Sequence, residues 1–264
     1  MAESAAKIGV HLPVTLSQIP EMARAAERAG VDAINMPESP LLYPDVYISC
    51  AASLMATSTL GVHTGVTNPV TRHPSVTAGT ARSLSQLGPN RTAIGIATGD
   101  SSCWGVGLKA ARLAELREYI VALRALLRGE EATYRGASFR GHWPDLDPSL
   151  APPVIVACSG PKTLKTSAQV ADGVIIAEMG YAPEDIARVL GVIEQGCAEV
   201  DRDPAELEIW WATTVAFGDD IEALYENAIG ATHWLLAGNP EEKGITDGLL
   251  PKLEQLHVDT HDLG

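Results

Sequence analysis

Short apolar segments alternate with longer amphipathic segments along most of this chain, and each kind has its own periodicity. The apolar segments are strand-sized and predict β-strands at 7–12, 32–37, 60–66, 92–98, 153–158, 173–177 and 207–217. The amphipathic segments predict helices at 17–29, 45–57, 74–87, 110–128, 161–171 and 183–200. We expect Ser17 to cap the first helix and Gly30 to end it.

A strand followed by a helix, repeated in one direction, is typical of a parallel sheet with helical crossovers. Such a sheet closes into a barrel or stays open and doubly wound. The turn at 11–17 lacks the glycine fingerprint of an open dinucleotide-binding sheet, so the sequence favours the barrel. A hairpin is predicted near 131–140, turning at Gly136, as an insertion in the repeat.

The composition restricts the class of partner. The 264 residues are 46% hydrophobic and 20% charged, as in ordinary globular proteins, and the net charge of −14 argues against nucleic acid as a partner. No apolar run is long enough to span a membrane, and residues 1–7 do not resemble a secretion signal. The four cysteines form no CxxC pair, which argues against a metal site and favours a reducing cytosol. We therefore expect a cytoplasmic protein that binds a small molecule.

A barrel places its chemistry on the loops that follow the strands, and two of these loops are rich in polar side chains. The first is TGVTNPVTRHP at 64–74, and the second is ATGDSS at 97–102. A purely structural role remains open for both loops. Asn68-Pro69 is a good turn, His73-Pro74 is a good helix start, and Asp100 or Ser101 can cap a short helix.

The loop after the fifth strand, Ser159-Gly160-Pro161-Lys162, enters a helix and suits an anion. Free backbone N–H groups and the helix dipole both favour a phosphate there, although many helices begin in this way. Three ionisable residues also end strands, and each can orient a ligand or simply cap a turn. They are His11, Glu38 and Glu178.

Five stretches together resemble the luciferase-like monooxygenase superfamily. They resemble in particular its branch around methylenetetrahydromethanopterin reductase, which uses the deazaflavin coenzyme F-420. The stretches are GVTNPVTRHP (65–74), IGIATGDS (94–101), GLKAARLAELREYIVALRALLRGE (107–130), ACSGPKTLKTSAQVADGVI (157–175) and RDPAELEIWW (202–211).

The resemblance implies an α/β fold of the (β/α)8 TIM-barrel type, formed as a single domain over 1–264, with the cofactor at the carboxyl ends of the strands. It implies a non-prolyl cis peptide at Gly65-Val66 that forms a bulge behind the cofactor ring. By the same resemblance the ring and polyol lie against Thr67, Asn68, Thr98, Gly99, Asp100 and Ser101. We add Glu178 as a further cofactor contact because of its place at the end of a strand. The phosphate lies at Ser159, Gly160, Pro161 and Lys162.

The resemblance also bears on the end of the chain. Relatives extend beyond the point that matches Gly264, so the eighth strand is expected to be missing within this chain, with a helical insert near 219–264. The segment 231–236 (ATHWLL) taken alone can be a strand, and we favour the insert. A homodimer would cover part of the exposed strand edges.

The implied function is an oxidoreductase that transfers a hydride between coenzyme F-420, or alternatively FMN, and a small organic substrate. The candidate catalytic residues are Asp100, His73, Glu38 and His11. Asp100 is also the first choice for cofactor contact, and Glu38 and His11 are candidates for the acid or base on the substrate side. Three alternatives remain open. They are an FMN-dependent luciferase-like monooxygenase, a non-catalytic flavin-binding or partner subunit, and an unrelated barrel lyase or isomerase that uses only the phosphate site.

Overall fold

The structure is a computed structural model that describes residues 6–144, 147–215, 218–219 and 251. These residues group into two compact units, which we treat separately. Unit 1 comprises Met1–Ala157 and Val170–Gly173, and unit 2 comprises Cys158–Gln169 and Val174–Gly264. The segment 231–236 and nearly all of the helical insert expected near 219–264 lie outside the described residues.

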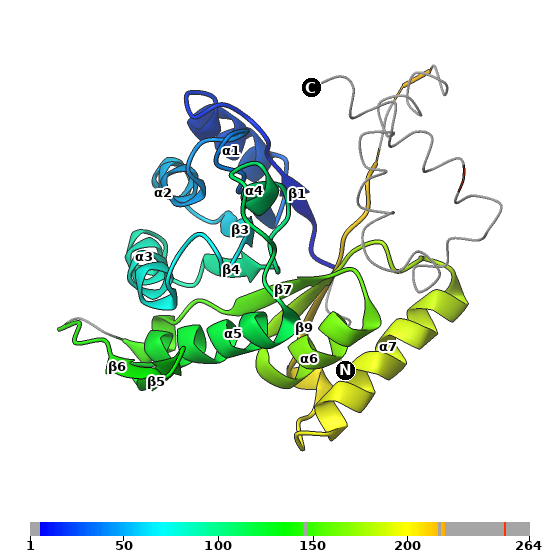
Figure 1. The fold of residues 1–264 in the computed structure, drawn as a ribbon. Helices are drawn as coiled ribbons and strands as arrows, with labels where there is room; N and C mark the ends of the chain where they lie inside the picture. The colour runs from blue at the N-terminus through cyan, green and yellow to red at the C-terminus, as the bar shows by residue number, and fades with distance from the viewer. Residues whose placement is uncertain (1–5, 145–146, 216–217, 220–250, 252–264) are drawn as a thin grey trace. The chain divides into compact units, whose positions relative to one another are not determined.

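The strands have the order expected for consecutive β/α repeats (Figure 1). The seven-stranded sheet runs β1 (Gly9–His11), β2 (Ala33–Met36), β3 (Gly61–Thr67), β4 (Thr92–Ile96), β7 (Val154–Cys158), β8 (Gly173–Ile176) and β9 (Glu208–Trp211). The pairs β1–β2, β2–β3, β3–β4 and β4–β7 are parallel. The prediction of a parallel α/β sheet with seven strands is confirmed for the described residues.

Helices connect the strands, and all except the short helix Ser101–Trp104 lie where the periodicity indicated. They are α1 (Ile19–Arg28), α2 (Val46–Ala56), α3 (Pro74–Leu87), α4 (Ser101–Trp104), α5 (Leu113–Leu127), α6 (Pro161–Val170) and α7 (Pro183–Ala198), with short 3₁₀ turns η1 (Pro148–Leu150) and η2 (Pro204–Glu206). In unit 1, α1 packs on α2, α2 on α3 and α3 on α5 (Figure 1). An antiparallel hairpin, β5 (Glu131–Tyr134) and β6 (Ala137–Arg140), packs on α5.

The helix ends show which local signals decide the boundaries. Asp45 caps α2, because its carboxylate accepts hydrogen bonds from the backbone N–H groups of Tyr47 and Ile48. Gly30 follows α1 with a φ of 77°, as expected of a glycine that ends a helix. The prediction that Ser17 caps α1 is wrong. The helix begins after Gln18, and the Ser17 hydroxyl lies 3.3 Å from that of Thr15 instead.

The middle of β3 carries a bulge that requires glycine on two neighbouring strands. The Gly65-Val66 peptide is cis, as predicted, and the pairing with β4 shifts between Thr64 and Thr67. A Cβ atom on Gly65 would lie 2.5 Å from the Cβ of Asn35 on β2. A Cβ atom on Gly95 of β4 would lie 2.1 Å from the carbonyl oxygen of Thr64. The bulge therefore fits only between backbones that approach closely.

This packing gives a direct prediction for the Gly95→Ala variant. The added methyl group overlaps the Thr64 carbonyl, so the backbone must shift, and we expect the free energy of unfolding to fall by about 1–3 kcal/mol. Gly79→Ala is the control in the same unit, because its nearest neighbour is 4.0 Å away and Gly79 lies inside α3. The control should be neutral or stabilised by up to about 1 kcal/mol. Equal stability of the two variants in urea unfolding would contradict this packing.

Candidate functional site

Asn68 is the centre of a buried polar cluster at the carboxyl ends of β2, β3 and β4. Its side chain is 1% exposed, and its Nδ2 donates to Glu38 Oε2 at 3.4 Å and to Ser102 Oγ at 3.2 Å. Its Oδ1 accepts the backbone N–H groups of Val70 and Thr71, both at 2.9 Å. The Asn68 side chain thus holds the loop after β3 against the ends of both neighbouring strands.

Glu38, which follows β2, is held inside the protein by a cation. Its side chain is 7% exposed, and Arg72 Nε lies 3.7 Å from its Oε1. Arg72 also pairs with Asp45, so one guanidinium is shared by two carboxylates. Desolvation by burial raises the pKa of Glu38 above its usual range, and the hydrogen bond with Thr67 and the charge of Arg72 oppose that rise. Glu38 can therefore retain a proton at a pH where an exposed glutamate has lost it.

The buried hydroxyl groups of Tyr47 and Thr67 also belong to this polar cluster. Thr67 is fully buried at the end of β3, and Tyr47 Oη donates to its Oγ1 at 3.3 Å. The guanidinium of Arg72 stacks 4.6 Å above the centre of the Tyr47 ring. Burial raises the pKa of Tyr47 to about 12, so this phenol stays protonated and donates a hydrogen bond.

The loop after β4 combines a left-handed glycine with a short helix. Gly99 has a φ of 97°, and a Cβ there would lie 2.5 Å from Cys103 Sγ and 3.3 Å from Asn68 Cβ. Asp100 is the residue that precedes α4, and its carbonyl accepts from the N–H of Cys103 at 2.7 Å. Gly99 is thus needed by the local packing as well as by any ligand that approaches its backbone.

Two further contacts connect the loop after β4 to neighbouring segments. The Ser101 hydroxyl lies 2.5 Å from that of Ser39, which follows Glu38. The Thr98 carbonyl accepts from the backbone N–H of Ala111 at 2.8 Å. The loop after β4 is therefore tied both to the end of β2 and to the segment that enters α5.

His11, the last residue of β1, lies against the bulge of β3. Its Nε2 would be 3.2 Å from a Cβ on Gly65, so the imidazole borders the cis peptide. The ring keeps an exposed face, while desolvation by the protein around it lowers the pKa of His11 below its usual value. A neutral imidazole at the end of β1 and a protonatable carboxyl at the end of β2 are suited to opposite steps of proton transfer.

His73, a predicted catalytic residue, contacts the start of α3 and the hairpin, and its catalytic role stays a prediction. It precedes α3, and its Nδ1 accepts from the backbone N–H of Ser75 at 3.3 Å. Its ring packs at centroid distances of 5.3 Å on Tyr134 and 5.2 Å on Phe139 of the hairpin. The side chain acts as a helix cap and a packing contact, because Pro74 directs the chain into the helix immediately after it.

The predicted phosphate turn and Glu178 lie in unit 2. Ser159 and Lys162 are exposed, and the Gly160 carbonyl accepts from the N–H of Leu164 in the first turn of α6. No atom of another described residue lies within 4 Å of the place where a Cβ on Gly160 would be. Glu178 follows β8 with a φ of 58°, an uncommon conformation for a residue other than glycine. Open space, and the N–H groups that the first turn of a helix leaves without intrahelical partners, make the turn suitable for an anion.

Sequence reasoning missed several residues of the cluster in unit 1. Arg72 and Ser102 lie inside polar loops in which the sequence does not distinguish one polar side chain from another. Ser39 follows Glu38 and has no sequence signal of its own. Tyr47 gave no signal, because one tyrosine in the apolar segment of α2 is typical of core packing.

In the part of the chain that the structure describes, no group of three His, Cys, Asp or Glu residues could hold a metal ion. None of the described helices is long and apolar enough to cross a membrane.

Residues 2–260 match the family model of luciferase-like monooxygenases, and the chain belongs to this family. The chain is 27% identical to 5,10-methylenetetrahydromethanopterin reductase of Methanolobus tindarius, over 85% of this chain and 69% of that protein. It is 28% identical to the F-420-dependent glucose-6-phosphate dehydrogenase of Beutenbergia cavernae, over 84% of this chain and 70% of that protein.

A solved structure supports the fold. The F-420-dependent tetrahydromethanopterin reductase of Methanopyrus kandleri superposes with a TM-score of 0.73 at 20% identity, over 93% of this chain and 77% of that one. The fold is that of the (β/α) barrels of this family, and the chain is an oxidoreductase of the luciferase-like kind.

Proposed function

We propose that this oxidoreductase transfers a hydride between coenzyme F-420 and a small organic substrate. The observation that carries the proposal is the bulge at Gly65-Val66 with the polar loops 67–68 and 98–101 beside it, in a chain similar to F-420-dependent enzymes. The bound deazaflavin would supply the hydride chemistry. The protein would position the ring, exclude water and handle protons.

The residues of unit 1 have separate roles in this proposal. Gly65 and Val66 would support the ring from behind, and the backbone of Gly99 would allow a close approach, with Asp100 as the contact that follows. Thr67, Asn68, Thr98 and Ser101 would line the ring and polyol. Glu38 would hold a proton for the substrate, and His11, neutral because its pKa is lowered, would accept one.

Unit 2, taken by itself, carries the residues that we propose bind the phosphate of the cofactor. Ser159, Gly160, Pro161 and Lys162 would hold its phosphate through backbone N–H groups and the Lys162 ammonium, and Glu178 would orient the polyol. The open space beside Gly160 supports this role, because an anion can approach the backbone there.

The test is turnover with each cofactor. Protein is mixed with reduced coenzyme F-420, or separately with reduced FMN and oxygen, in the presence of candidate acceptors. We expect turnover with F-420 that falls by about 100-fold in Asp100→Ala. Turnover with FMN alone would make the protein a luciferase-like monooxygenase and would contradict the deazaflavin proposal.

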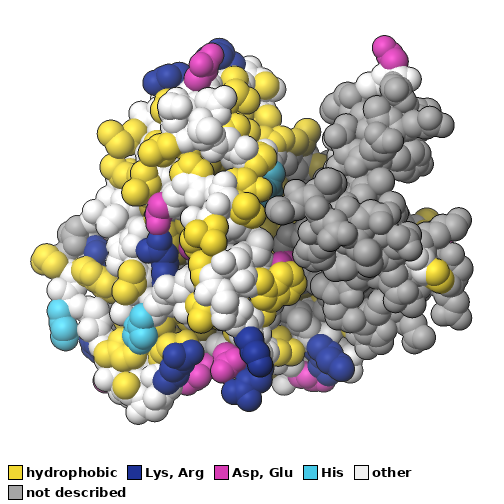
Figure 2. Space-filling view, turned by 45° about the horizontal axis from the view of Figure 1, so that its top comes forward, with side chains coloured by type: hydrophobic (Ala, Val, Ile, Leu, Met, Phe, Trp, Pro, Cys, Tyr) yellow, Lys and Arg dark blue, Asp and Glu magenta, His cyan; other side chains and the backbone are white. Residues whose placement is uncertain are grey.

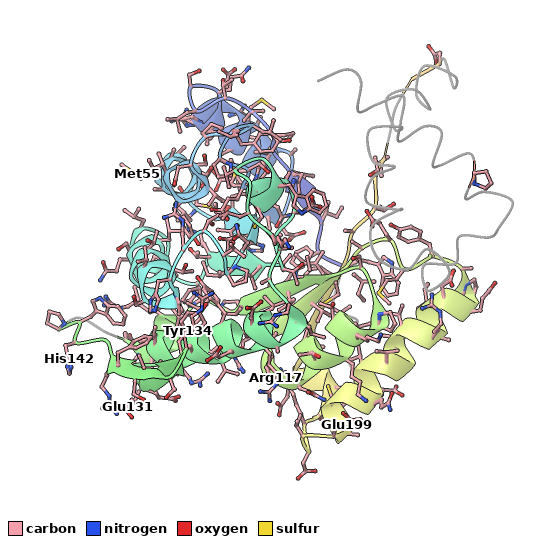
Figure 3. All side chains as sticks on the ribbon, viewed as in Figure 1. Met55, Arg117, Glu131, Tyr134, His142 and Glu199 are labelled. Atoms are coloured by element: carbon pink, nitrogen blue, oxygen red, sulfur yellow. The ribbon has the colours of Figure 1, made fainter. Side chains whose placement is uncertain are left out.

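We further propose a homodimer in which α2 contacts its counterpart. The eleven residues of α2 include no charged side chain, and Ile48 and Met55 are 56% and 76% exposed. Met55 points outward from α2 (Figure 3), and apolar side chains are exposed at several places on the face in Figure 2. Two copies that each carry a charge of −14 repel one another, so an uncharged helix is a favourable place for contact. Met55→Glu should give monomers in light scattering, whereas Glu21→Gln should not.

The domain organisation and the location in the cell are two further proposals. Residues 1–264 would form a single luciferase-like barrel domain, for which one cooperative unfolding transition in calorimetry is the expected result. The protein would act in the cytoplasm, and this location is supported by its four cysteines, which are all buried and form no disulfide. Recovery of the native protein from a secreted fraction would contradict that location.

A further inference from the structure

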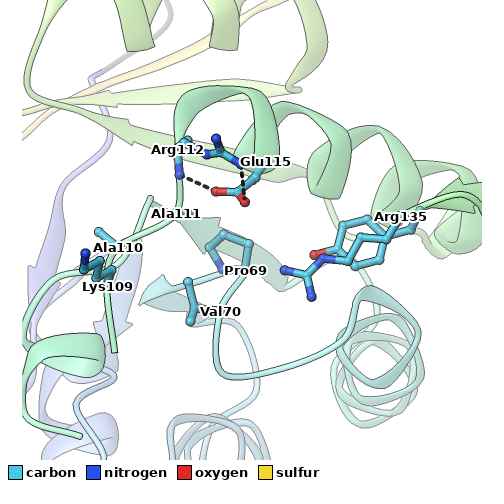
Figure 4. Close-up of a pocket in the computed structure, with 9 residues that line it drawn as sticks. Pro69, Val70, Lys109, Ala110, Ala111, Arg112, Glu115 and Arg135 are labelled. Carbon is cyan, nitrogen blue, oxygen red and sulfur yellow. Dashed lines mark hydrogen bonds and ion pairs between the residues drawn. The ribbon is translucent and has the colours of Figure 1, made fainter. Parts of the chain in front are cut away.

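A pocket of about 310 Å³ opens in unit 1 beside the loop that follows β3 (Figure 4). Pro69 and Val70 form an apolar wall, and the segment that enters α5 forms the opposite side. The ionisable residues that line the pocket are Lys109, Arg112, Glu115 and Arg135. Three cations and one carboxylate therefore surround a small volume.

Glu115, the single carboxylate among the residues that line the pocket, already forms an ion pair with Arg112. Glu115 accepts from the backbone N–H of Arg112 at 2.7 Å and from its guanidinium at 3.2 Å. These hydrogen bonds from Arg112 hold the pKa of Glu115 below its usual range, so its charge is constant at neutral pH. Among the described residues, no carboxylate lies within 4 Å of the charged groups of Lys109 or Arg135. The pocket thus retains positive charge after its internal ion pair is formed.

The positive charge of the pocket is opposite in sign to the net charge of the chain. The chain carries a net charge of −14, so its general field repels anions. The guanidinium of Arg135 and the ammonium of Lys109, on different sides of the pocket (Figure 4), with the amino end of the 15-residue helix α5 nearby, create a local field of the opposite sign. Such a pocket selects small anions and has little attraction for cations.

The pocket adjoins the candidate cofactor site within unit 1. Pro69 and Val70 directly follow Asn68, and Ala111 on the pocket wall donates its N–H to the carbonyl of Thr98. Asn68 and Thr98 are residues that we place beside the cofactor ring. A molecule that reacts at the ring can therefore extend one end into this pocket.

We propose that this pocket binds a carboxylate or phosphate group, and that the group belongs to the substrate. The second half rests on the proposed function, whereas the binding of the anion does not. The substrate class is then a small organic acid or phosphate ester that reacts at a carbon outside the pocket. Lys109 and Arg135 bind the anion, and Arg112 with Glu115 fixes the shape of the pocket.

The binding is tested without cofactor, by calorimetric titration of the full chain with inorganic phosphate and with succinate. We expect wild-type protein to bind at least one probe with a Kd on the order of 1 mM. The double variant Lys109→Gln/Arg135→Gln should bind about tenfold more weakly or worse. Arg117→Gln is the matched control: Arg117 is exposed on α5 outside the pocket (Figure 3) and should bind like wild type. No binding by wild type, or equal binding by the double variant, overturns the site.

The assignment to the substrate is tested in the turnover assay. The double variant should raise KM for an anionic acceptor by about tenfold and leave F-420 affinity unchanged. If F-420 affinity falls while KM is unchanged, the anion belongs to the cofactor and the assignment to the substrate is wrong. If no protein turns over, the substrate assignment falls with the proposed function, while the calorimetric result for the pocket stands on its own.

Discussion

Replacing Gly160 by valine should weaken cofactor binding by more than about tenfold, or about 1.4 kcal/mol, and leave the protein folded. The cofactor phosphate is proposed to lie against the backbone of this residue, and a β-branched side chain fills the space that it needs. The fold should survive because, within the part of the chain that the structure describes, no neighbouring atom lies within 4 Å of the new Cβ atom. Fluorescence titration with F-420 gives the affinity, and circular dichroism gives the folded fraction.

The control for this variant is Gly191→Val in the same unit. Gly191 is exposed within α7, and a Cβ there also meets no atom of the described neighbours within 4 Å. The control should keep the wild-type affinity, so that any loss in Gly160→Val comes from the turn at 159–162. Unchanged affinity in a folded Gly160→Val protein would remove this turn from the site.

The second large effect is expected in Glu38→Gln, and it has opposite signs for activity and stability. Turnover should fall by about 100-fold if Glu38 transfers a proton, because glutamine cannot do so. Stability near neutral pH should rise, because glutamine avoids the cost of an ionised carboxylate in a buried position.

The pH dependence follows from the raised pKa of Glu38. The folded pKa lies above the unfolded value of 4.5, so the neutral carboxyl is favoured in the folded state. Its contribution is fully present below pH 4.5 and is lost as the pH rises through the folded pKa. The stability advantage of Glu38→Gln should therefore grow over this window.

Glu21→Gln, on the exposed face of α1, should change stability by less than about 0.5 kcal/mol and leave turnover unchanged. A Glu38→Gln protein that is as active as wild type would exclude Glu38 from proton transfer. An advantage that does not vary with pH would contradict the burial of an ionisable group at this position.

The elements could be predicted from the sequence because their signals are local. Hydrophobic periodicity and the residues at the ends of segments located the helix at 74–87 and the glycine that ends α1. Ser17 was the exception, because a turn that includes Thr15 and Gln18 precedes the helix. A serine before a helical pattern is a weaker signal than the geometry of the chain that leads to it.

The site was only partly predictable, because its partners come from different strands. Asn68 meets Glu38 across 30 positions, and Ser39 meets Ser101 across 62 positions. No local pattern encodes such pairs. His73 shows the opposite case, since it lies in a polar loop beside true members of the cluster. Its ring nevertheless turns to the hairpin, which a sequence pattern does not reveal.

The proposed use of coenzyme F-420 is tested directly by an equilibrium titration of the purified protein with oxidised coenzyme F-420 and, in parallel, with FMN. A shift in the deazaflavin absorbance follows binding, because the ring leaves water for the protein. We expect saturable binding of F-420 with a Kd on the order of micromolar, and FMN binding at least about tenfold weaker. Failure of both cofactors to bind at about millimolar concentration would contradict the account and leave the partner-subunit interpretation in its place.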